Sequence, residues 1–495
     1  MSYTESFRQT ELARIDRVIS EGPYQADWDS LCQWQAPDWY RDAKFGIFTH
    51  WGLYTVPEHD NEWYSRNMYL EGMEAYRHHL ETYGPQKDFG YKDFIPLFTA
   101  PRFDPDEWAE TFRDAGARYY VPVAEHHDGF QIYKSALSRY NAAEMGPRRD
   151  VIGELHAASG KAGLYACASS HRAEHWWFMG NGKKFDSDVK EPLRQGDFYW
   201  PAMPEADHFD IHSTPVPTAE YLDDWLLRTV EIVDRFHPKM IYFDWWIQHV
   251  AFEPYLKRFA AYYYNVSLRQ GFVPVIAYKH DSFVYGSALP DVERGQLAEI
   301  QASPWQTDMA CALNSWCYTD GNQYRDAAGI VCDMMDIVSK NGNLLLNVGP
   351  RADGSIGAED RKILREIGAF LKANGEAVYG TRPWRVYGEG PTKVEGGFFT
   401  DGQKKEFTCE DFRFTQKGAA IYVTALRPSA DGAYLCRTFR ESKQPAFNGL
   451  HHDISRVTRP DGEALDWERT ENGLLLRTAA DPARTMPVVF KLELA

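Results

Sequence analysis

The sequence predicts an α/β protein, a (β/α) TIM-like barrel followed by a small C-terminal antiparallel β-sandwich. Over residues 1–377, short apolar strands alternate with longer helical segments. Most of these strands are apolar throughout, as expected for parallel strands covered on both faces. Over residues 378–495 the pattern changes to strands without long helices between them. A chain of 495 residues is long enough for one barrel and a smaller domain.

Six segments of the first part are predicted to be parallel strands because they are short and apolar and alternate with helical stretches. A doubly wound open sheet is the alternative, but no GxGxxG follows the first strand. Repeated β–α units therefore favour the barrel. The predicted strands are Lys44–Gly52, Arg118–His127, Lys161–Ser169, Lys239–Trp246, Val273–Lys279 and Asn343–Gly349.

Two of the helical segments have clear end signals. The segment Thr218–Phe236 begins with a threonine that can cap the helix. The segment Ala358–Gly375 has acidic residues in its first turn and a glycine where the helix should end. The polar stretch Gly180–Phe198 predicts a long loop at the rim of the site.

The C-terminal part contains three segments with strand character and a turn signal. Asn472-Gly473 lies between two apolar runs and predicts a hairpin turn. These features are typical of a small antiparallel sandwich. The strand segments are Ala419–Pro428, Glu463–Ala479 and Met486–Ala495.

Composition and charge restrict the partners and the location. A net charge of −17 argues against nucleic acid or an anionic membrane as the main partner. No apolar run reaches the roughly 18 residues of a membrane span, and the first residues lack the features of a signal peptide. The seven cysteines are scattered without a CxxC pair, so neither zinc nor disulfides are predicted. We expect a cytoplasmic protein with free thiols, and a homo-oligomer stays open.

Polar side chains follow several predicted strands at the point where each strand ends. His50 ends the first strand, and His126 and His127 end the second. Asp244 ends the fourth strand, and Asn347 lies near the end of the last. Because barrel enzymes carry their catalytic groups at the C-terminal ends of the strands, these residues are predicted to meet in one site.

Asp244 is the strongest single candidate for catalysis. It follows an apolar strand and precedes Trp245 and Trp246, and burying an unpaired carboxylate is costly. A salt bridge or a helix cap would also explain it, whereas the functional interpretation is a nucleophile or base facing a sugar, with a tryptophan lining the pocket. A retaining glycosidase needs a second carboxyl, and Glu293, then Glu299, are the candidates just past the fifth strand.

The histidines allow a second interpretation, as metal ligands. Adjacent residues of a strand point to opposite faces, so His126 and His127 enter one site only if the strand bends. The chain contains no HxH or HExxH motif, and we predict no metal. It also lacks a phosphate-binding GKS or GKT sequence and a GxSxG elbow.

Several long motifs, in the same order, resemble the α-L-fucosidases of glycoside hydrolase family 29. The resemblance spans roughly residues 36–385, and "EAVYGTRPW" at Glu376–Trp384 is similar to that family's exit from the barrel. The motifs are Arg41–Tyr69, Glu125–Leu155, "IYFDWW" around Asp244 and Ser339–Ile356.

The resemblance implies a retaining exo-α-L-fucosidase without a cofactor. Asp244 would be the nucleophile and Glu293 the acid/base, and the substrate would be a fucosylated oligosaccharide or glycoconjugate. Many members place glycine after the nucleophile, so "FDWW" implies a bulkier pocket wall and a narrower choice of substrate. The family's fucose-binding residues fall on His50, Trp63, His126 and His127, and Trp246 and Lys279 are further candidates for contact with the sugar.

Two other functions remain alternatives. One is a metal-dependent hydrolase on the same barrel, with ligands from His50, His126, His127 and Asp128. The other is a non-catalytic fucose-binding protein. The sequence leaves open the fucosyl linkage, the group to which fucose is attached, and the role of the C-terminal domain.

Overall fold

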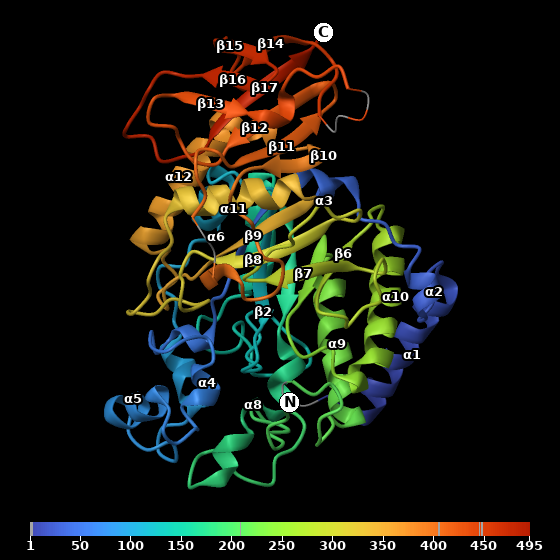
Figure 1. The fold of residues 1–495 in the computed structure, drawn as a ribbon. Coiled ribbons are helices and arrows are strands. Elements are labelled where there is room, and N and C mark those ends of the chain that lie inside the picture. The colour runs from blue at the N-terminus through green and yellow to red at the C-terminus, as the bar shows by residue number, and fades with distance from the viewer. Residues whose placement is uncertain (1–2, 208, 404–405, 445, 447–448) are drawn as a thin grey trace.

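A closed parallel barrel forms the larger part of the chain, as predicted (Figure 1). The structure is a computed structural model that describes residues 3–207, 209–403, 406–444, 446 and 449–495. The strand order is β1-β9-β8-β7-β6-β5-β4-β2, and β1 also pairs with β2, which closes the sheet. The short strands β3 and β4 share one position because both pair with β2. The bounds are β1 (Phe45–Thr49), β2 (Tyr119–Glu125), β3 (Tyr165–Ala166), β4 (Ala168–Ser170), β5 (Met240–Phe243), β6 (Val275–Lys279), β7 (Leu289–Glu293), β8 (Trp305–Ala310) and β9 (Gly342–Val348).

Helices cover the outside of the barrel, and the two predicted end signals are confirmed. The hydroxyl of Thr218 accepts a hydrogen bond from the amide of Tyr221 and caps α9. Helix α12 ends at Asn374, followed by Gly375 as its C-cap. The bounds are α1 (Glu5–Glu21), α2 (Trp28–Leu31), α3 (Asp38–Ala43), α4 (Tyr64–Asn67), α5 (Glu74–Thr82), α6 (Pro105–Asp114), α7 (Val151–Ala162), α8 (His175–Phe178), α9 (Ala219–Phe236), α10 (Glu253–Arg269), α11 (Ala327–Ser339) and α12 (Ala358–Asn374). Among the described residues, no helix combines the length and the apolar character that crossing a bilayer requires.

Strand β7 shows where a search for apolar runs fails. Glu293 follows the fifth predicted strand, as expected, but it is the last residue of a further strand that the sequence did not predict. The strand contains Asp291, whose carboxylate accepts a hydrogen bond from Lys279 Nζ at 2.7 Å. A polar strand residue can be buried when its charge is paired, and such a strand no longer looks apolar in the sequence.

The C-terminal part forms two antiparallel sheets that pack as a sandwich, shown in orange and red in Figure 1. The predicted hairpin is present, but its turn lies one residue earlier, at Glu471 and Asn472, because Gly473 already pairs with Thr470. The strand bounds are β10 (Arg382–Glu389), β11 (Phe412–Lys417), β12 (Ala420–Ala425), β13 (Ala433–Cys436), β14 (Ile454–Thr458), β15 (Trp467–Thr470), β16 (Gly473–Arg477) and β17 (Val488–Leu494).

Strands β10 and β11 of the sandwich contact helix α11 of the barrel. At this contact Asp336 of α11 is fully buried and accepts hydrogen bonds from Lys340 at 2.7 Å and from Arg413 of β11. The two parts therefore share buried charge pairs, and such pairs fix one geometry because an unpaired partner would be costly.

Candidate active site

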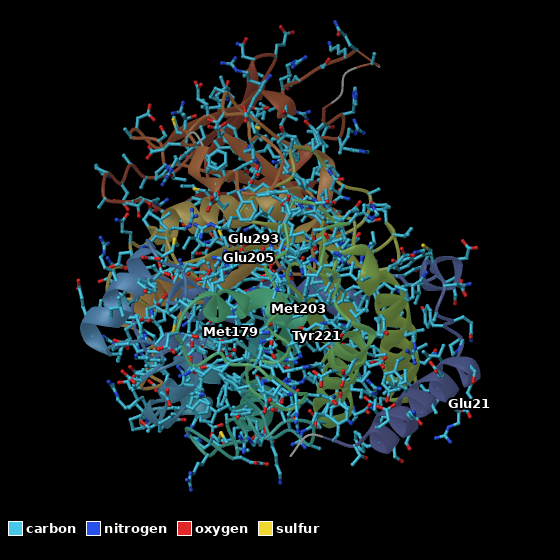
Figure 2. The ribbon with its side chains drawn as sticks, turned by 90° about the horizontal axis from the view of Figure 1, so that it is seen from below. Glu21, Met179, Met203, Glu205, Tyr221 and Glu293 are labelled. Carbon is cyan, nitrogen blue, oxygen red and sulfur yellow. The ribbon has the colours of Figure 1, made fainter. Side chains whose placement is uncertain are left out.

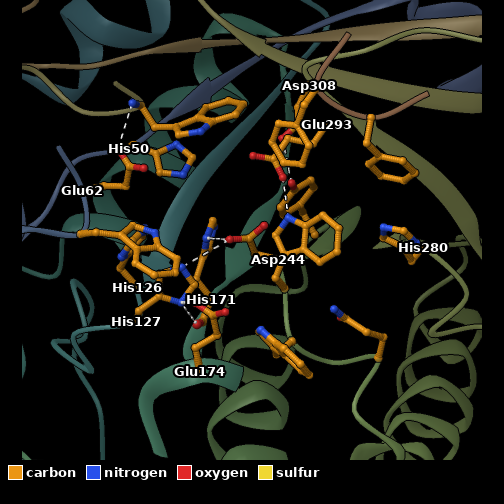
Figure 3. A pocket seen from close by; sticks show the side chains of 18 of the residues that line it. His50, Glu62, His126, His127, His171, Glu174, Asp244, His280, Glu293 and Asp308 are labelled. Atoms are coloured by element: carbon orange, nitrogen blue, oxygen red, sulfur yellow. Dashed lines mark hydrogen bonds and ion pairs between the residues drawn. The ribbon is translucent and has the colours of Figure 1, made fainter. Parts of the chain in front are cut away.

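A cavity of about 790 Å³ opens at the C-terminal ends of the barrel strands (Figure 3). His50 follows β1, His127 follows β2 and His171 follows β4. Asp244 follows β5, and Glu293 ends β7. Figure 2 shows Glu293 near the middle of the molecule when it is viewed from below. The strand ends thus bring together residues that lie up to 243 positions apart in the chain, from His50 to Glu293.

Most of the residues predicted for the site line this cavity. Three are placed elsewhere: Lys279 lies beneath the cavity wall, Asn347 is buried behind His50, and Glu299, the second choice for the acid, is exposed and does not line the cavity. Of the two glutamates, only Glu293 therefore lies where it could act on a group bound in the cavity. The predicted residues that line the cavity are His50, Trp63, His126, His127, Asp244, Trp246 and Glu293.

The adjacent histidines both enter the cavity because strand β2 ends before them. Its last residue is Glu125, and its pairing with β4 shifts register between Val123 and Glu125. Adjacent strand residues can reach one site only where the strand is irregular, and this register shift is such an irregularity. His126 and His127 then turn toward the same site from the strand end (Figure 3).

Two histidines hold the carboxylate of Asp244. His171 Nδ1 lies 3.0 Å from Asp244 Oδ2, and His127 Nε2 lies 3.5 Å from the same oxygen. The other nitrogen of His171 lies 3.1 Å from Ser169 Oγ. His127 Nδ1 lies 2.7 Å from the carbonyl oxygen of His171, to which it donates, and 3.3 Å from Glu174 Oε2. Both imidazoles are therefore fixed in orientation by partners on their far side.

These contacts set the charge of Asp244. Burial alone would raise its pKa, but the neighbouring His171 and His127 hold the pKa well below the ordinary value of 3.8. For His127, burial opposes the charge, whereas Glu174 and Asp244 favour it and raise the pKa to about 9. At neutral pH an imidazolium thus lies beside an ionised carboxylate that faces the cavity.

Two further histidines of the cavity, His50 and His126, are neutral. Burial lowers the pKa of His50 and of His126 well below 6.5. His50 Nδ1 lies 2.7 Å from Asn347 Oδ1, which fixes the ring. His126 Nδ1 is buried and has no hydrogen-bond partner among the described residues. Neutral imidazoles suit the hydroxyl groups of a sugar because each ring can donate through one nitrogen and accept through the other.

Glu293 has the opposite protonation state to Asp244. Burial, helped by Asp308 and Asp244, raises its pKa to about 8, although Lys279 and the hydrogen bond from Trp245 lower it. Trp245 Nε1 donates a hydrogen bond to Glu293 Oε2 at 2.5 Å. Glu293 is therefore a carboxylic acid at neutral pH and can give a proton to a bound group.

Lys279 acts on Glu293 from below and does not reach the cavity. Its ammonium is fully buried and lies 2.7 Å from Asp291, 2.8 Å from Asp308 and 3.4 Å from Glu293. These carboxylates overcome the effect of burial and raise the pKa of Lys279 well above 10.5. The structure thus makes Lys279 a positioning residue for the acid, whereas the sequence interpretation placed it on the substrate.

Replacing Lys279 is expected to destabilise the protein and to change Glu293. In Lys279→Met, the free energy of unfolding should fall by about 3–5 kcal/mol, because the lost ammonium leaves buried carboxylates unpaired. The pKa of Glu293 should rise because Lys279 lowers it in the wild type. Urea unfolding measures the first effect, and the alkaline limb of kcat/KM, moved to higher pH, measures the second.

Lys362→Met on the exposed face of α12 is the matched control, since it removes an ammonium that lies in solvent. If both variants unfold at the same urea concentration, the buried cluster contributes nothing specific. An alkaline limb at the wild-type position would show that Lys279 does not act on Glu293.

The sequence interpretation missed several residues of the cavity. His171 follows a predicted strand, so the rule that found His50 could have found it. Glu62 lies inside the motif Arg41–Tyr69, and its carboxylate accepts a hydrogen bond from the amide of Trp316 at 3.0 Å. Burial raises the pKa of Glu62, which makes it a second candidate acid. The predicted rim loop, residues 180–198, supplies no residue to this cavity.

Within the described part of the chain, two groups of side chains could hold a metal ion. One consists of His50, His126 and His171, and the other of His127, His171 and Asp244, with ligand atoms within 4.8 Å of one another in each group. Asp128 belongs to neither. Its carboxylate instead accepts hydrogen bonds from Tyr91 and from the amide of Phe130, at 2.7 and 3.0 Å. The ligand set proposed from the sequence is therefore not assembled.

Comparison with known proteins agrees with the fold. The sequence profile of the family described as Alpha-L-fucosidase matches residues 12–376. Tissue alpha-L-fucosidase of Rattus norvegicus is 31% identical over 83% of this chain and 80% of the relative. Plasma alpha-L-fucosidase of Homo sapiens is 30% identical over 73% of each chain.

A solved structure supports the same assignment across both parts of the chain. The alpha-fucosidase of Thermotoga maritima superposes with a TM-score of 0.72 at 27% identity, covering 95% of this chain and 100% of that one. The same enzyme was also solved in complex with fucose, with a TM-score of 0.71 at 26% identity and coverage of 95% and 100%. The chain described here belongs to the α-L-fucosidase family of glycoside hydrolases.

Proposed function

We propose that the protein is a retaining, exo-acting α-L-fucosidase that works through a covalent fucosyl-enzyme. One observation carries this proposal: two carboxyl groups face one cavity with their pKa values shifted in opposite directions. Asp244 is ionised, and Glu293, with a pKa of about 8, is protonated. Environments that separate two carboxyl groups in this way assign one as nucleophile and the other as acid.

In the first step, an oxygen of Asp244 attacks C1 of fucose while Glu293 gives its proton to the leaving oxygen. The bond from C1 to that oxygen breaks, and an ester between Asp244 and C1 forms. His127 and His171 hold the attacking carboxylate in place through Oδ2. The product of this step leaves as a neutral alcohol.

In the second step, Glu293 is a carboxylate and takes a proton from water. The oxygen of that water attacks C1, the ester bond to Asp244 breaks, and fucose leaves with the α configuration. Glu293 is then protonated again, and Asp244 is ionised again. No metal or cofactor takes part in either step of this proposal.

The exo-acting mode follows from the closed histidine side of the cavity. His50, His126, His127 and His171 are each at most 4% exposed, so a sugar that reaches them cannot extend further. Only a terminal residue fits such a position. The solved complexes of the Thermotoga maritima enzyme with fucose and with a mechanism-based inhibitor support this proposal and the covalent step.

Hydrolysis of nitrophenyl α-L-fucoside in the presence of EDTA tests the proposed function. We expect turnover, with α-L-fucose as the first product in proton NMR before mutarotation. β-L-Fucose as the first product would contradict the retaining mechanism. Binding of fucose without any turnover would instead favour the alternative of a non-catalytic fucose-binding protein.

EDTA also decides the alternative of a metal-dependent hydrolase. We expect that treatment with EDTA leaves kcat/KM unchanged, because the protonated His127 beside Asp244 disfavours a cation at that group. The measurement is the activity of one sample before treatment, after treatment and after addition of Zn²⁺. Activity lost to EDTA and restored by Zn²⁺ would assign a metal to the histidines.

The substrate class that we propose is a fucosylated oligosaccharide or glycoconjugate. A cytoplasmic location also stays a proposal, supported by seven cysteines that are all free thiols.

A further inference from the structure

The side of the cavity opposite His50, His126, His127 and His171 is built from aromatic rings (Figure 3). The Trp245 ring lies 4.8 Å from His280 and 6.3 Å from Phe399, in the second case nearly parallel at 18°. Phe398 stacks on His280 at 4.4 Å and 7°. We call these four rings, Trp245, His280, Phe398 and Phe399, the aromatic wall. Trp245 belongs both to the wall and to the environment of the acid, because it donates to Glu293.

Half of the aromatic wall comes from the C-terminal part of the chain. Phe398 and Phe399 lie between β10 and β11, in a segment that crosses to the barrel. The amide of Phe399 donates to the carbonyl of Glu293, and the amide of Gly397 donates to the carbonyl of Gln296, each at 2.9 Å. The segment thus runs along the residues that carry the acid.

Side chains and close packing fix this segment. Asp401 forms ion pairs with Arg294 and Arg325 of the barrel. A Cβ atom on Gly295 would lie 1.9 Å from the carbonyl oxygen of Gly397, so only glycine permits this approach. Phe399 has a φ of 54°, which is rare for a bulky side chain and requires support from its surroundings.

The aromatic wall offers apolar surface to something outside the protein. Phe399 is 52% exposed although it lines the cavity, and Phe209 and Ile211 add exposed apolar atoms nearby. Exposed apolar groups beside a cavity mark binding surfaces. Fucose is one six-membered ring, and a cavity of about 790 Å³ has room for a second.

We propose that the aromatic wall binds the ring to which fucose is attached, by stacking that ring on Trp245 and Phe399. This inference rests on the proposed function, because the acid Glu293 must face the oxygen that joins the two rings. The group beyond that oxygen then lies against the wall beside Glu293. The ligand is a flat ring with an apolar face, either a pyranose or an aryl group. The segment around Phe399 thereby gives the C-terminal domain a part in substrate choice.

Three substrates that differ only in the leaving group test this proposal: an α-L-fucosyl disaccharide, nitrophenyl α-L-fucoside and α-L-fucosyl fluoride. The leaving group of α-L-fucosyl fluoride is a fluoride ion, which has no ring that could stack on the aromatic wall. In Phe399→Ala, kcat/KM should fall roughly tenfold for the two substrates with a ring and stay within about twofold for the fluoride. Phe399→Tyr keeps a ring and should retain the wild-type values. Phe7→Ala, an exposed phenylalanine of α1 outside the cavity, is the matched control.

Each other outcome is decisive. An equal loss on all three substrates would show that Phe399 only supports the structure, and unchanged values on all three would show that no ring binds there. A loss confined to the disaccharide or to the nitrophenyl substrate would identify which kind of ring the wall binds.

If the wild type hydrolyses none of the three substrates, the proposed function fails, and the aromatic wall is tested by binding alone. Quenching of tryptophan fluorescence by nitrophenol should then weaken in Phe399→Ala, and equal quenching would overturn the proposal.

Discussion

Asp244→Gly is expected to lose at least roughly 10³-fold in kcat/KM on nitrophenyl α-L-fucoside, because the variant removes the atom that bonds to C1. Steady-state kinetics measures this loss. Azide should restore turnover, since it fits the space that the carboxylate leaves. Its nitrogen then attacks C1 from the side of Asp244 while nitrophenol leaves, so the product should be β-L-fucosyl azide. NMR of that product reports directly on which face the nucleophile occupies.

Glu174→Gln is the matched comparison for this variant. Glu174 lies 3.3 Å from His127, so its loss should lower the pKa of that histidine without removing the nucleophile. We expect a smaller loss of activity that azide does not restore. Turnover retained by Asp244→Gly, or azide rescue in Glu174→Gln, would assign the nucleophile to another residue.

Glu293→Gln is expected to lose roughly 10²–10⁴-fold on an α-L-fucosyl disaccharide, whose leaving group needs a proton. The loss in kcat/KM on nitrophenyl α-L-fucoside should be much smaller, because nitrophenolate leaves without help. Azide should accelerate the second step and give α-L-fucosyl azide, the anomer opposite to that from Asp244→Gly. Kinetics on the two substrates and NMR of the products measure these effects.

The dependence of kcat/KM on pH also tests whether Glu293 is the acid. The reaction needs protonated Glu293, so kcat/KM should be full below its pKa of about 8 and fall as the pH rises through that value. The ionised Asp244 should keep its activity down to acidic pH, because its pKa is lowered. In Glu293→Gln the alkaline limb should disappear.

Two results would contradict this assignment. An alkaline limb that persists in Glu293→Gln would point to His127, whose pKa is about 9. A disaccharide-specific loss in Glu62→Gln, together with normal activity of Glu293→Gln, would make Glu62 the acid. Glu62→Gln and Glu293→Gln make the same chemical change. Each variant therefore controls for the structural effect of losing a buried carboxylate in the other.

The local features of the sequence were enough to predict the barrel. Apolar runs predicted β1 and β9 because these strands are buried on both faces, and the Thr218 cap predicted where α9 begins. Strand β7 could not be found in this way, because Asp291 is buried beside Lys279 and a pattern of apolar residues does not record paired charges.

From the residues that follow its apolar runs, the sequence was enough to predict that His50, His126, His127 and Asp244 meet at one cavity. This works because parallel strands of a barrel end on the same side. The three-dimensional contacts were needed to show that His171 and His127 share Asp244, that Glu293 and not the exposed Glu299 lines the cavity, and that Lys279 lies beneath Glu293. The same holds for Phe399, which reaches the cavity from the C-terminal part. These outcomes depend on burial and on contacts between distant segments, which set charge and position and which no local pattern of residues encodes.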